Sequence, residues 1–173
     1  VVKDSEAVAI IFESATEKTI VSSSEANPLT KIAVETDHEI GTPWEQFKNC
    51  HPAPKSSNAY PDSTSVMLYT SGTTGRSKGV PRNHFSERAS AIAHIAQNLY
   101  HQEEVTLGVM PLYHTMGVRS LLASIINNGH FVCQRRFDPE EALHLIEKEK
   151  ITNLYLVPTL YHDLISSQSF SHT

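Results

Sequence analysis

Short apolar runs alternate with segments of helical periodicity from residue 66 to the end of the 173-residue chain. The apolar runs have the length and composition of buried strands, and the segments between them carry apolar residues every three to four positions. The expected strands are 66–70, 105–110, 131–133 and 153–157, and the expected helices are 84–100, 116–127, 138–150 and one that begins at Pro158. Because strands that alternate with helices are joined by crossover connections, this order predicts a layered α/β fold with a largely parallel sheet.

The first 62 residues carry weaker signals. Residues 7–12 and 31–36 have strand character. Thr42 and Pro43 resemble a helix start, with Thr42 as N-cap and Pro43 in the first turn. Three prolines between positions 51 and 62 indicate a connector. We therefore expect one incomplete domain, in which a poorly readable portion and linker at 1–62 precede an α/β portion at 63–173.

Composition narrows the class of protein. No run of about 18 apolar residues is present, so we expect no transmembrane segment. The start of the chain has no secretory pattern, and its first residue, Val1, is typical of a processed or excised product. Cys50 and Cys133 form no CxxC pair, and no glycosylation sequon occurs. These features favour a reduced, cytoplasmic setting.

The net charge of −5 is unevenly distributed. Residues 1–62 hold ten acidic and five basic residues, whereas nine of each follow. No acidic residue lies between Asp62 and Glu87, a stretch that contains Arg76, Lys78 and Arg82. A locally cationic segment in an acidic protein suits a small anion, and it disfavours nucleic-acid binding, which needs a broader basic face.

The segment LYTSGTTGRSKGV, residues 68–80, holds three of the seven glycines. A strand that leads through such a loop into a helix can present several backbone N–H groups to one anion. Hydroxyl groups and the Lys78 ammonium would add further donors. The spacing differs from GxxxxGK[ST], because Gly79 follows the lysine. A flexible surface loop is the plain alternative, but the buried strand and the absence of acidic residues favour a phosphate loop.

The stretch YTSGTTGRSKGV resembles the phosphate-loop motif TSGTTGxPKG of the adenylate-forming superfamily, which includes acyl- and aryl-CoA synthetases, luciferases and the adenylation domains of peptide synthetases. Ser77 stands where the motif usually has proline. MPLYHTMGV, residues 110–118, resembles the family's next motif, and FDPEEALHLIEKEKITNLYLVPTLY, residues 137–161, resembles the stretch that follows. The resemblance covers residues 63–165 and leans toward the acyl- or aryl-CoA synthetases.

This resemblance implies that a carboxylic acid reacts with Mg²⁺-bound ATP to give an acyl-adenylate, and that coenzyme A then displaces AMP. His114 matches the residue beside the reacting carboxylate and is the candidate catalytic residue. No metal ligand is assigned to the chain. The residues that match the nucleotide-gripping loop are Thr70, Ser71, Gly72, Thr73, Thr74, Gly75 and Lys78, and those that match the acyl pocket are Tyr113, Thr115, Met116 and Gly117.

Several family segments are missing. The chain has no GYGxTE-like segment, no later Tyr-x-x-Gly-Asp and no C-terminal lysine domain. We therefore expect a fragment of the large N-terminal domain, inactive alone and prone to self-association through surface that the missing parts would cover. The alternatives are a non-catalytic nucleotide- or phosphate-binding or interaction module, and an amino-acid-adenylating or luciferase-like relative. The acyl substrate is not determined by these motifs.

Overall fold

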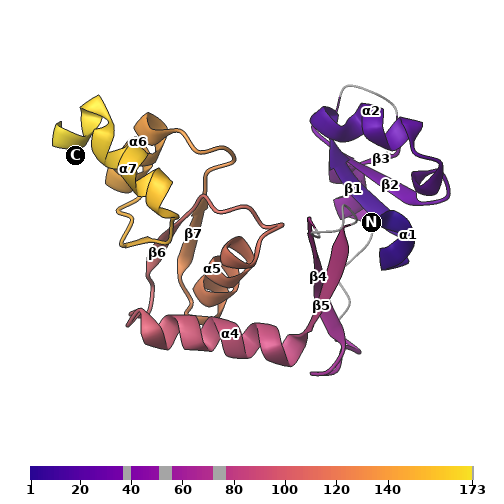
Figure 1. Ribbon diagram of the computed structural model, residues 1–173, viewed down its shortest axis with the longest axis horizontal. Coiled ribbons are helices and arrows are strands. Elements are labelled where there is room, and N and C mark those ends of the chain that lie inside the picture. Colours follow the sequence, from indigo (N-terminus) through magenta and orange to yellow (C-terminus); the bar gives the residue numbers. More distant parts are fainter. Residues whose placement is uncertain (37–39, 51–55, 72–76, 173) are drawn as a thin grey trace. The chain divides into compact units, whose positions relative to one another are not determined.

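A computed structural model describes residues 1–36, 40–50, 56–71 and 77–172 (Figure 1). The chain divides into two compact units. Unit 1 comprises Val1–Ala59 and Tyr69–Val80, and unit 2 comprises Tyr60–Leu68 and Pro81–Thr173. The chain passes from unit 1 to unit 2 after Ala59, returns to unit 1 at Tyr69 and passes to unit 2 again at Pro81.

Unit 1 is built on a parallel sheet of strand order β1-β2-β3, in which Ile11 pairs with Ile32 and Ala33 with Pro43. Phe12, Ile32 and Ala33 are buried in its core. Its strands are β1 (Ala9–Glu13), β2 (Thr30–Val34) and β3 (Thr42–Pro43), and its helices are α1 (Val2–Ser5), α2 (Ser14–Ser22), the 3-10 turn η1 (Ser24–Ala26) and α3 (Trp44–Cys50).

One expectation for this unit is wrong, and one helix was missed. Thr42 and Pro43 form strand β3 instead of capping a helix, and α3 begins only at Trp44. Helix α2 was not expected, because its sequence SATEKTIVS is rich in Ser, Thr and Val, which are mediocre helix formers. Sheet pairing and packing within the unit override these weak local preferences.

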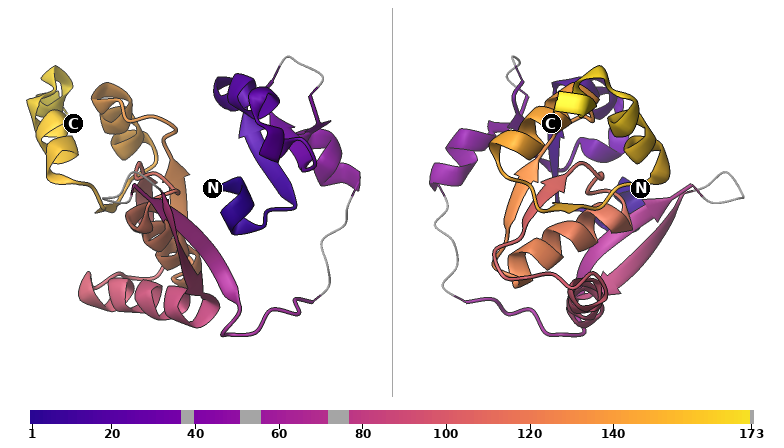
Figure 2. Two further views of the ribbon diagram at one scale, coloured as in Figure 1. Left: turned by 45° about the vertical axis from the view of Figure 1, so that its right-hand side comes forward. Right: turned by 90° about the vertical axis from the view of Figure 1, so that its left-hand side faces the viewer.

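Strands β4 (Thr64–Thr70) and β5 (Lys78–Asn83) pair as a separate two-stranded sheet, and the two run side by side in both views of Figure 2. The residues between them, 71–77, are too few for a parallel crossover, so the pair is an antiparallel hairpin. The expected order of strand, loop and helix is therefore wrong, since a second strand precedes the helix. Pro81 is tolerated in β5 because each strand of a two-stranded sheet is an edge.

Unit 2 contains a second parallel sheet, of strand order β7-β6-β8. Thr106 of the central strand pairs with Phe131 on one side and Asn153 on the other. The two parallel sheets confirm the expected α/β class. The strands are β6 (Val105–Gly108), β7 (His130–Cys133) and β8 (Asn153–Leu154), and the helices are α4 (His84–Gln97), α5 (Thr115–Ile126), α6 (Pro139–Lys148), α7 (Pro158–Ser166) and the 3-10 turn η2 (Gln168–His172).

Helices cover both faces of the sheet in unit 2. β7 follows β6 in the chain and pairs with it on one side, whereas β8 follows β7 and pairs with β6 on the other side. Because the two connections run in opposite directions across the sheet and crossovers are right-handed, α5 and α6 lie on opposite faces. Leu107 of β6 packs in an apolar cluster with Leu143 of α6 and Leu164 of α7. The neighbouring Thr106 points to the other face of the sheet, toward the side on which α5 packs, because side chains alternate along a strand.

The helix starts follow the local sequence closely. Asp138 is the N-cap of α6, and its Oδ1 accepts a hydrogen bond of 2.8 Å from the Glu141 N–H, with Pro139 at the first helical position. This confirms the expected cap. Asn83 caps α4 in the same way, accepting from the Ser86 N–H at 2.8 Å.

Helix α4 does not bury all the apolar residues that lie at helical spacing in the expected helix 84–100. Phe85 and Leu99, the latter just beyond the end of α4, are 66% and 79% exposed. The buried side of the helix carries Glu87, Ala91 and His94 instead. Periodicity identified the helix correctly, but which face is covered depends on partners distant in the sequence.

No helix within the described part of the chain has the length and apolar character needed to cross a bilayer.

Candidate functional site

The predicted phosphate loop joins the two strands of the β4–β5 hairpin. Thr70 ends β4, Ser71 follows it, and Lys78 begins β5, so these three predicted residues lie at the two ends of the loop with exposed side chains. The other four, Gly72, Thr73, Thr74 and Gly75, lie outside the described residues.

Lys78 carries the formal charge at this end of the hairpin. Within the described ranges, no ion pair or hydrogen bond involves its ammonium group. An exposed ammonium group without a protein partner can bind an anion without first breaking an existing interaction. The geometry at the start of β5 is thus compatible with a cationic contact to a phosphate group.

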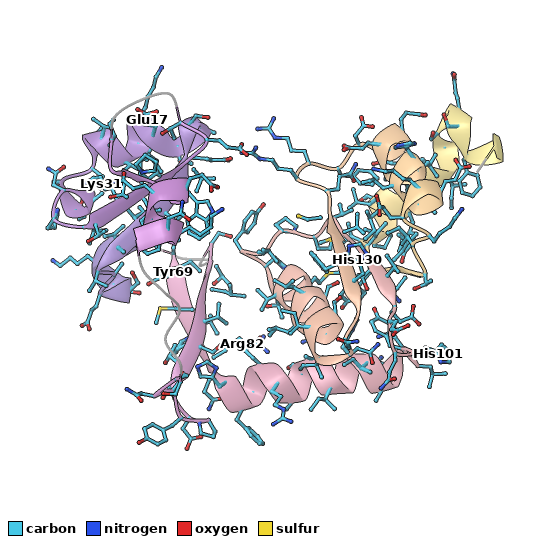
Figure 3. All side chains as sticks on the ribbon, turned by 180° about the vertical axis from the view of Figure 1, so that it is seen from behind. Glu17, Lys31, Tyr69, Arg82, His101 and His130 are labelled. Carbon is cyan, nitrogen blue, oxygen red and sulfur yellow. The ribbon has the colours of Figure 1, made fainter. Side chains whose placement is uncertain are left out.

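Tyr69 anchors the end of β4 within unit 1, and sequence reasoning missed this contact. Its hydroxyl donates a hydrogen bond of 2.7 Å to Asp4 Oδ2 (Figure 3). The hydrogen bond with the Asp4 carboxylate, reinforced by burial, raises the pKa of Tyr69. The partners are 65 positions apart, so no local pattern could have revealed the pair.

A second missed contact stabilises the corner where β5 leads into α4. Arg82 Nε forms an ion pair with Glu87 Oε1, and Arg82 Nη2 donates to Ser90 Oγ at 3.2 Å (Figure 3). Glu87 is buried, so its carboxylate depends on this partner. The hairpin that carries the loop therefore continues into α4 through a corner held by an ion pair.

His114 is the N-cap of α5. Its Nδ1 accepts a hydrogen bond of 3.3 Å from the Met116 N–H. A neutral ring that accepts at Nδ1 carries its proton on Nε2. The ring is exposed, so Nε2–H is a donor available to a ligand.

The residues around His114 form one compact turn. Tyr113 is exposed, Thr115 and Met116 are partly buried, and Gly117 is buried. The structure brings these four predicted pocket residues together at the start of α5. In the structure the nearest neighbours of Gly117 are the backbones of Met110 and Pro111.

Sheet topology supports His114 as a ligand contact. The segment that contains it follows the carboxyl end of β6, the central strand of the order β7-β6-β8. The connections from β6 and β7 run to opposite faces, and ligands of open α/β sheets bind in the crevice outside such strand ends. His114 and Lys78 belong to different units.

The described residues contain no group of three or more His, Cys, Asp or Glu side chains placed to hold a metal ion. The buried His94 of unit 2 takes part in a chain of hydrogen bonds. His94 Nε2 lies 3.0 Å from the Tyr100 hydroxyl, which donates to Asn153 Oδ1 at 2.6 Å. Sequence analysis did not single out these residues, because they are distributed over α4, the following loop and β8.

Curated relatives match about three fifths of this chain. The 4-chlorobenzoate–CoA ligase of Pseudomonas sp. is 37% identical over 102 residues, which is 57% of this chain and 19% of the relative. The 2-succinylbenzoate–CoA ligase of Bacillus licheniformis is 36% identical over 112 residues, covering 64% of this chain and 23% of the relative. The chain thus spans about a fifth of the length of these ligases.

Solved structures match nearly the whole chain. The N-terminal domain of FACL13 from Mycobacterium tuberculosis, solved with an inhibitor, matches with a TM-score of 0.80 at 20% identity, over 97% of this chain and 42% of that one. O-succinylbenzoate coenzyme A synthetase (MenE) from Bacillus subtilis, in complex with AMP, matches with a TM-score of 0.76 at 25% identity, over 95% of this chain and 32% of that one.

The FACL13 likeness shows the fold, which is that of part of an N-terminal domain. The sequence also matches the family described as AMP-binding enzyme over residues 1–173. Since that match covers the whole chain, the protein belongs to the AMP-binding enzyme family.

Proposed function

We propose that this chain supplies the phosphate-binding loop and part of the acyl-binding site of an ATP-dependent carboxylate–CoA ligase. The observation that carries the proposal is the stretch YTSGTTGRSKGV at the end of β4, in a chain that matches the AMP-binding family throughout. The relatives are named for aromatic carboxylic acids, 4-chlorobenzoate and 2-succinylbenzoate. From them we infer only a carboxylic acid as substrate.

The proposed reaction has two steps. A carboxylate oxygen of the acid attacks the α-phosphorus of ATP, the bond to the pyrophosphate oxygen breaks, and an acyl-adenylate forms. The thiol sulfur of coenzyme A then attacks the acyl carbon, AMP leaves with its oxygen, and the thiol proton passes to solvent. The first step places negative charge on the leaving pyrophosphate, so positioning and electrostatic stabilisation are the main tasks of the protein.

The loop residues perform the first of these tasks in the proposal. Hydroxyl and backbone N–H groups bind the β- and γ-phosphates, while the Lys78 ammonium balances their charge. The exposure of Lys78 and its lack of a described protein partner support this role. The residues assigned to the loop are Thr70, Ser71, Gly72, Thr73, Thr74, Gly75 and Lys78.

His114 orients the reacting carboxylate in the proposal. Because Met116 N–H occupies Nδ1, the ring offers Nε2–H as a hydrogen-bond donor to a carboxylate oxygen. Tyr113, Thr115, Met116 and Gly117 would form one wall of the acyl pocket beside it. Mg²⁺ would accompany ATP and neutralise part of its charge, and we assign it no ligand from this chain.

A second candidate is phosphate or nucleotide binding without catalysis. The chain covers only 19% to 23% of the relatives' length, which favours this candidate for the chain by itself. Both candidates need the loop to bind phosphates, and they differ in whether the bound phosphates belong to a reaction that activates a carboxylate.

Binding of ATP and pyrophosphate, measured by isothermal titration calorimetry, tests the loop assignment. Lys78→Ala should weaken pyrophosphate binding roughly 10- to 150-fold, the effect of losing one charge-assisted contact. Lys18→Ala removes the same charge from an exposed site on α2 and should leave affinity unchanged. Equal losses of pyrophosphate affinity in the two variants, or no binding of pyrophosphate by the wild-type chain, would refute the assignment.

Carboxylate-dependent exchange of pyrophosphate into ATP tests whether this chain activates carboxylates by itself. Exchange should be absent for this chain with pools of either fatty or aryl acids, although pyrophosphate binds. Exchange with one pool would instead show that the chain activates carboxylates by itself and would identify the class of acid.

A further inference from the structure

Four polar residues in unit 2 form a continuous hydrogen-bonded chain, which we call the His94 relay. Asn98 Nδ2 lies 3.1 Å from His94 Nδ1, and His94 Nε2 lies 3.0 Å from the Tyr100 hydroxyl. That hydroxyl is in turn 2.6 Å from Asn153 Oδ1. The relay connects the C-terminal turn of α4 to the first residue of β8.

Only one arrangement of protons satisfies all three bonds. The Nδ2 group of Asn98 can only donate, and it also donates to His94 O at 2.8 Å, so His94 Nδ1 accepts and its Nε2 carries the proton. The Nε2–H group then donates to the oxygen of Tyr100, whose own proton is donated to Asn153. The relay therefore requires a neutral imidazole.

The surroundings of His94 oppose a positive charge. Its side chain is 4% exposed and packs edge-on against the Tyr155 ring, with centroids 4.5 Å apart. Arg119 of α5 is the charged group that acts on it, and within the described part of the chain the Nε atom of Arg119 has no hydrogen-bond partner. Burial first, and then the Arg119 charge, lower the pKa of His94 below its usual value. Burial raises the pKa of Tyr100 to about 12.

The helix end that the relay holds is strained. Leu99 has φ of 54°, in the left-handed region that favours glycine. The Tyr100 N–H bonds to Ile95 O at 3.1 Å and the Leu99 N–H to Ala96 O at 3.4 Å, the pattern of a Schellman motif. The Leu99 side chain is exposed, so its packing does not offset the backbone cost. Tyr100 is thus held beside a strained residue by its hydroxyl contacts.

We propose that the His94 relay is an acid-sensitive latch, which holds the last turn of α4 against β8 while His94 is neutral and releases it when the imidazole is protonated. A proton on Nδ1 opposes the Asn98 amide donor and places a second positive charge near Arg119. The ring relieves both by moving toward water, which removes the hydrogen bond to Tyr100. The strained turn at Leu99 then opens.

Hydrogen exchange measured by mass spectrometry tests the latch on the whole chain. After correction for intrinsic exchange, the protection of residues 95–101 should fall roughly two- to tenfold between about pH 7.5 and about pH 5.5. His94→Gln keeps an N–H donor for Tyr100 but cannot titrate, so its protection should be independent of pH. His144→Gln removes an exposed histidine of α6 and should retain the wild-type response.

A wild-type chain without this loss of protection would overturn the proposal, and so would an unchanged pH response in His94→Gln. If His94→Gln does not fold, Tyr100→Phe provides the test, because it keeps the ring and removes the hydroxyl. Its protection at neutral pH should equal that of the wild-type chain in acid. Wild-type protection in Tyr100→Phe at neutral pH would rule out the latch.

Discussion

The backbone of Gly117, in the first turn of α5, lies directly against the carbonyl group of Pro111. A Cβ atom at position 117 would meet the carbonyl carbon of Pro111 at 2.6 Å and the carbonyl oxygens of Pro111 and Met110 closer still. The absence of a side chain therefore lets the helix begin immediately beside the segment that precedes it. This close approach positions His114, which caps the same turn.

Gly117→Ala should destabilise the chain by about 1–3 kcal/mol or more, because the obstructing atoms are backbone and cannot rotate away. Gly108→Ala is the matched variant, since its added methyl would meet the ring of Phe131. That ring can move, so the loss should be smaller. Urea unfolding followed by circular dichroism gives both values, and an equal or larger loss for Gly108→Ala would contradict this explanation.

Substitutions of His114 should separate its capping role from its proposed contact with the carboxylate. His114→Ala removes the acceptor for the Met116 N–H and should cost about 0.5–2 kcal/mol of stability. His114→Asn retains a good N-cap and should unfold like the wild-type chain. Both variants should weaken binding of a non-hydrolysable acyl-adenylate analogue, whereas wild-type affinity in His114→Asn would limit the residue to a capping role.

Leu99→Gly should stabilise the chain by about 0.5–1 kcal/mol, because glycine adopts φ of 54° without strain and the leucine side chain is exposed. Asn128 has the same φ of 54°, but asparagine tolerates this conformation better. Asn128→Gly should therefore gain less stability. Chemical unfolding measures the gain in unfolding free energy of each variant, and a larger gain for Asn128→Gly than for Leu99→Gly would disprove the account of strain.

Stability should decline in alkali as Tyr100 ionises in the unfolded chain. Burial raises its pKa from 10.0 to about 12, so the unfolded state loses the proton first. The contribution is fully present below about pH 10 and is lost as the pH rises toward 12. Unfolding free energies measured across this range should fall less steeply in Tyr100→Phe. Tyr113→Phe, at an exposed position, should keep the wild-type slope.

Local signals predicted much of unit 2 correctly. The cap at Asp138 with Pro139, and the strands and helices that follow residue 104, depend on neighbours in sequence and on periodicity. The motif around the phosphate loop likewise identified the family, because its residues are contiguous. Strand β5 was missed because it forms by pairing with β4, and the sequence of the glycine-rich segment does not reveal this pairing.

The sequence by itself determined the α/β class, the order of elements after residue 104, the cap of α6 at Asp138 and the family, since all of these depend on residues close together in the chain. Only the tertiary structure decided that α4 buries Glu87 and His94 while exposing Phe85, that Gly117 packs on Pro111, and that His94 connects through Tyr100 to Asn153. The reason is physical: periodicity shows that a helix has two faces, but the face that is buried is the one that distant segments cover.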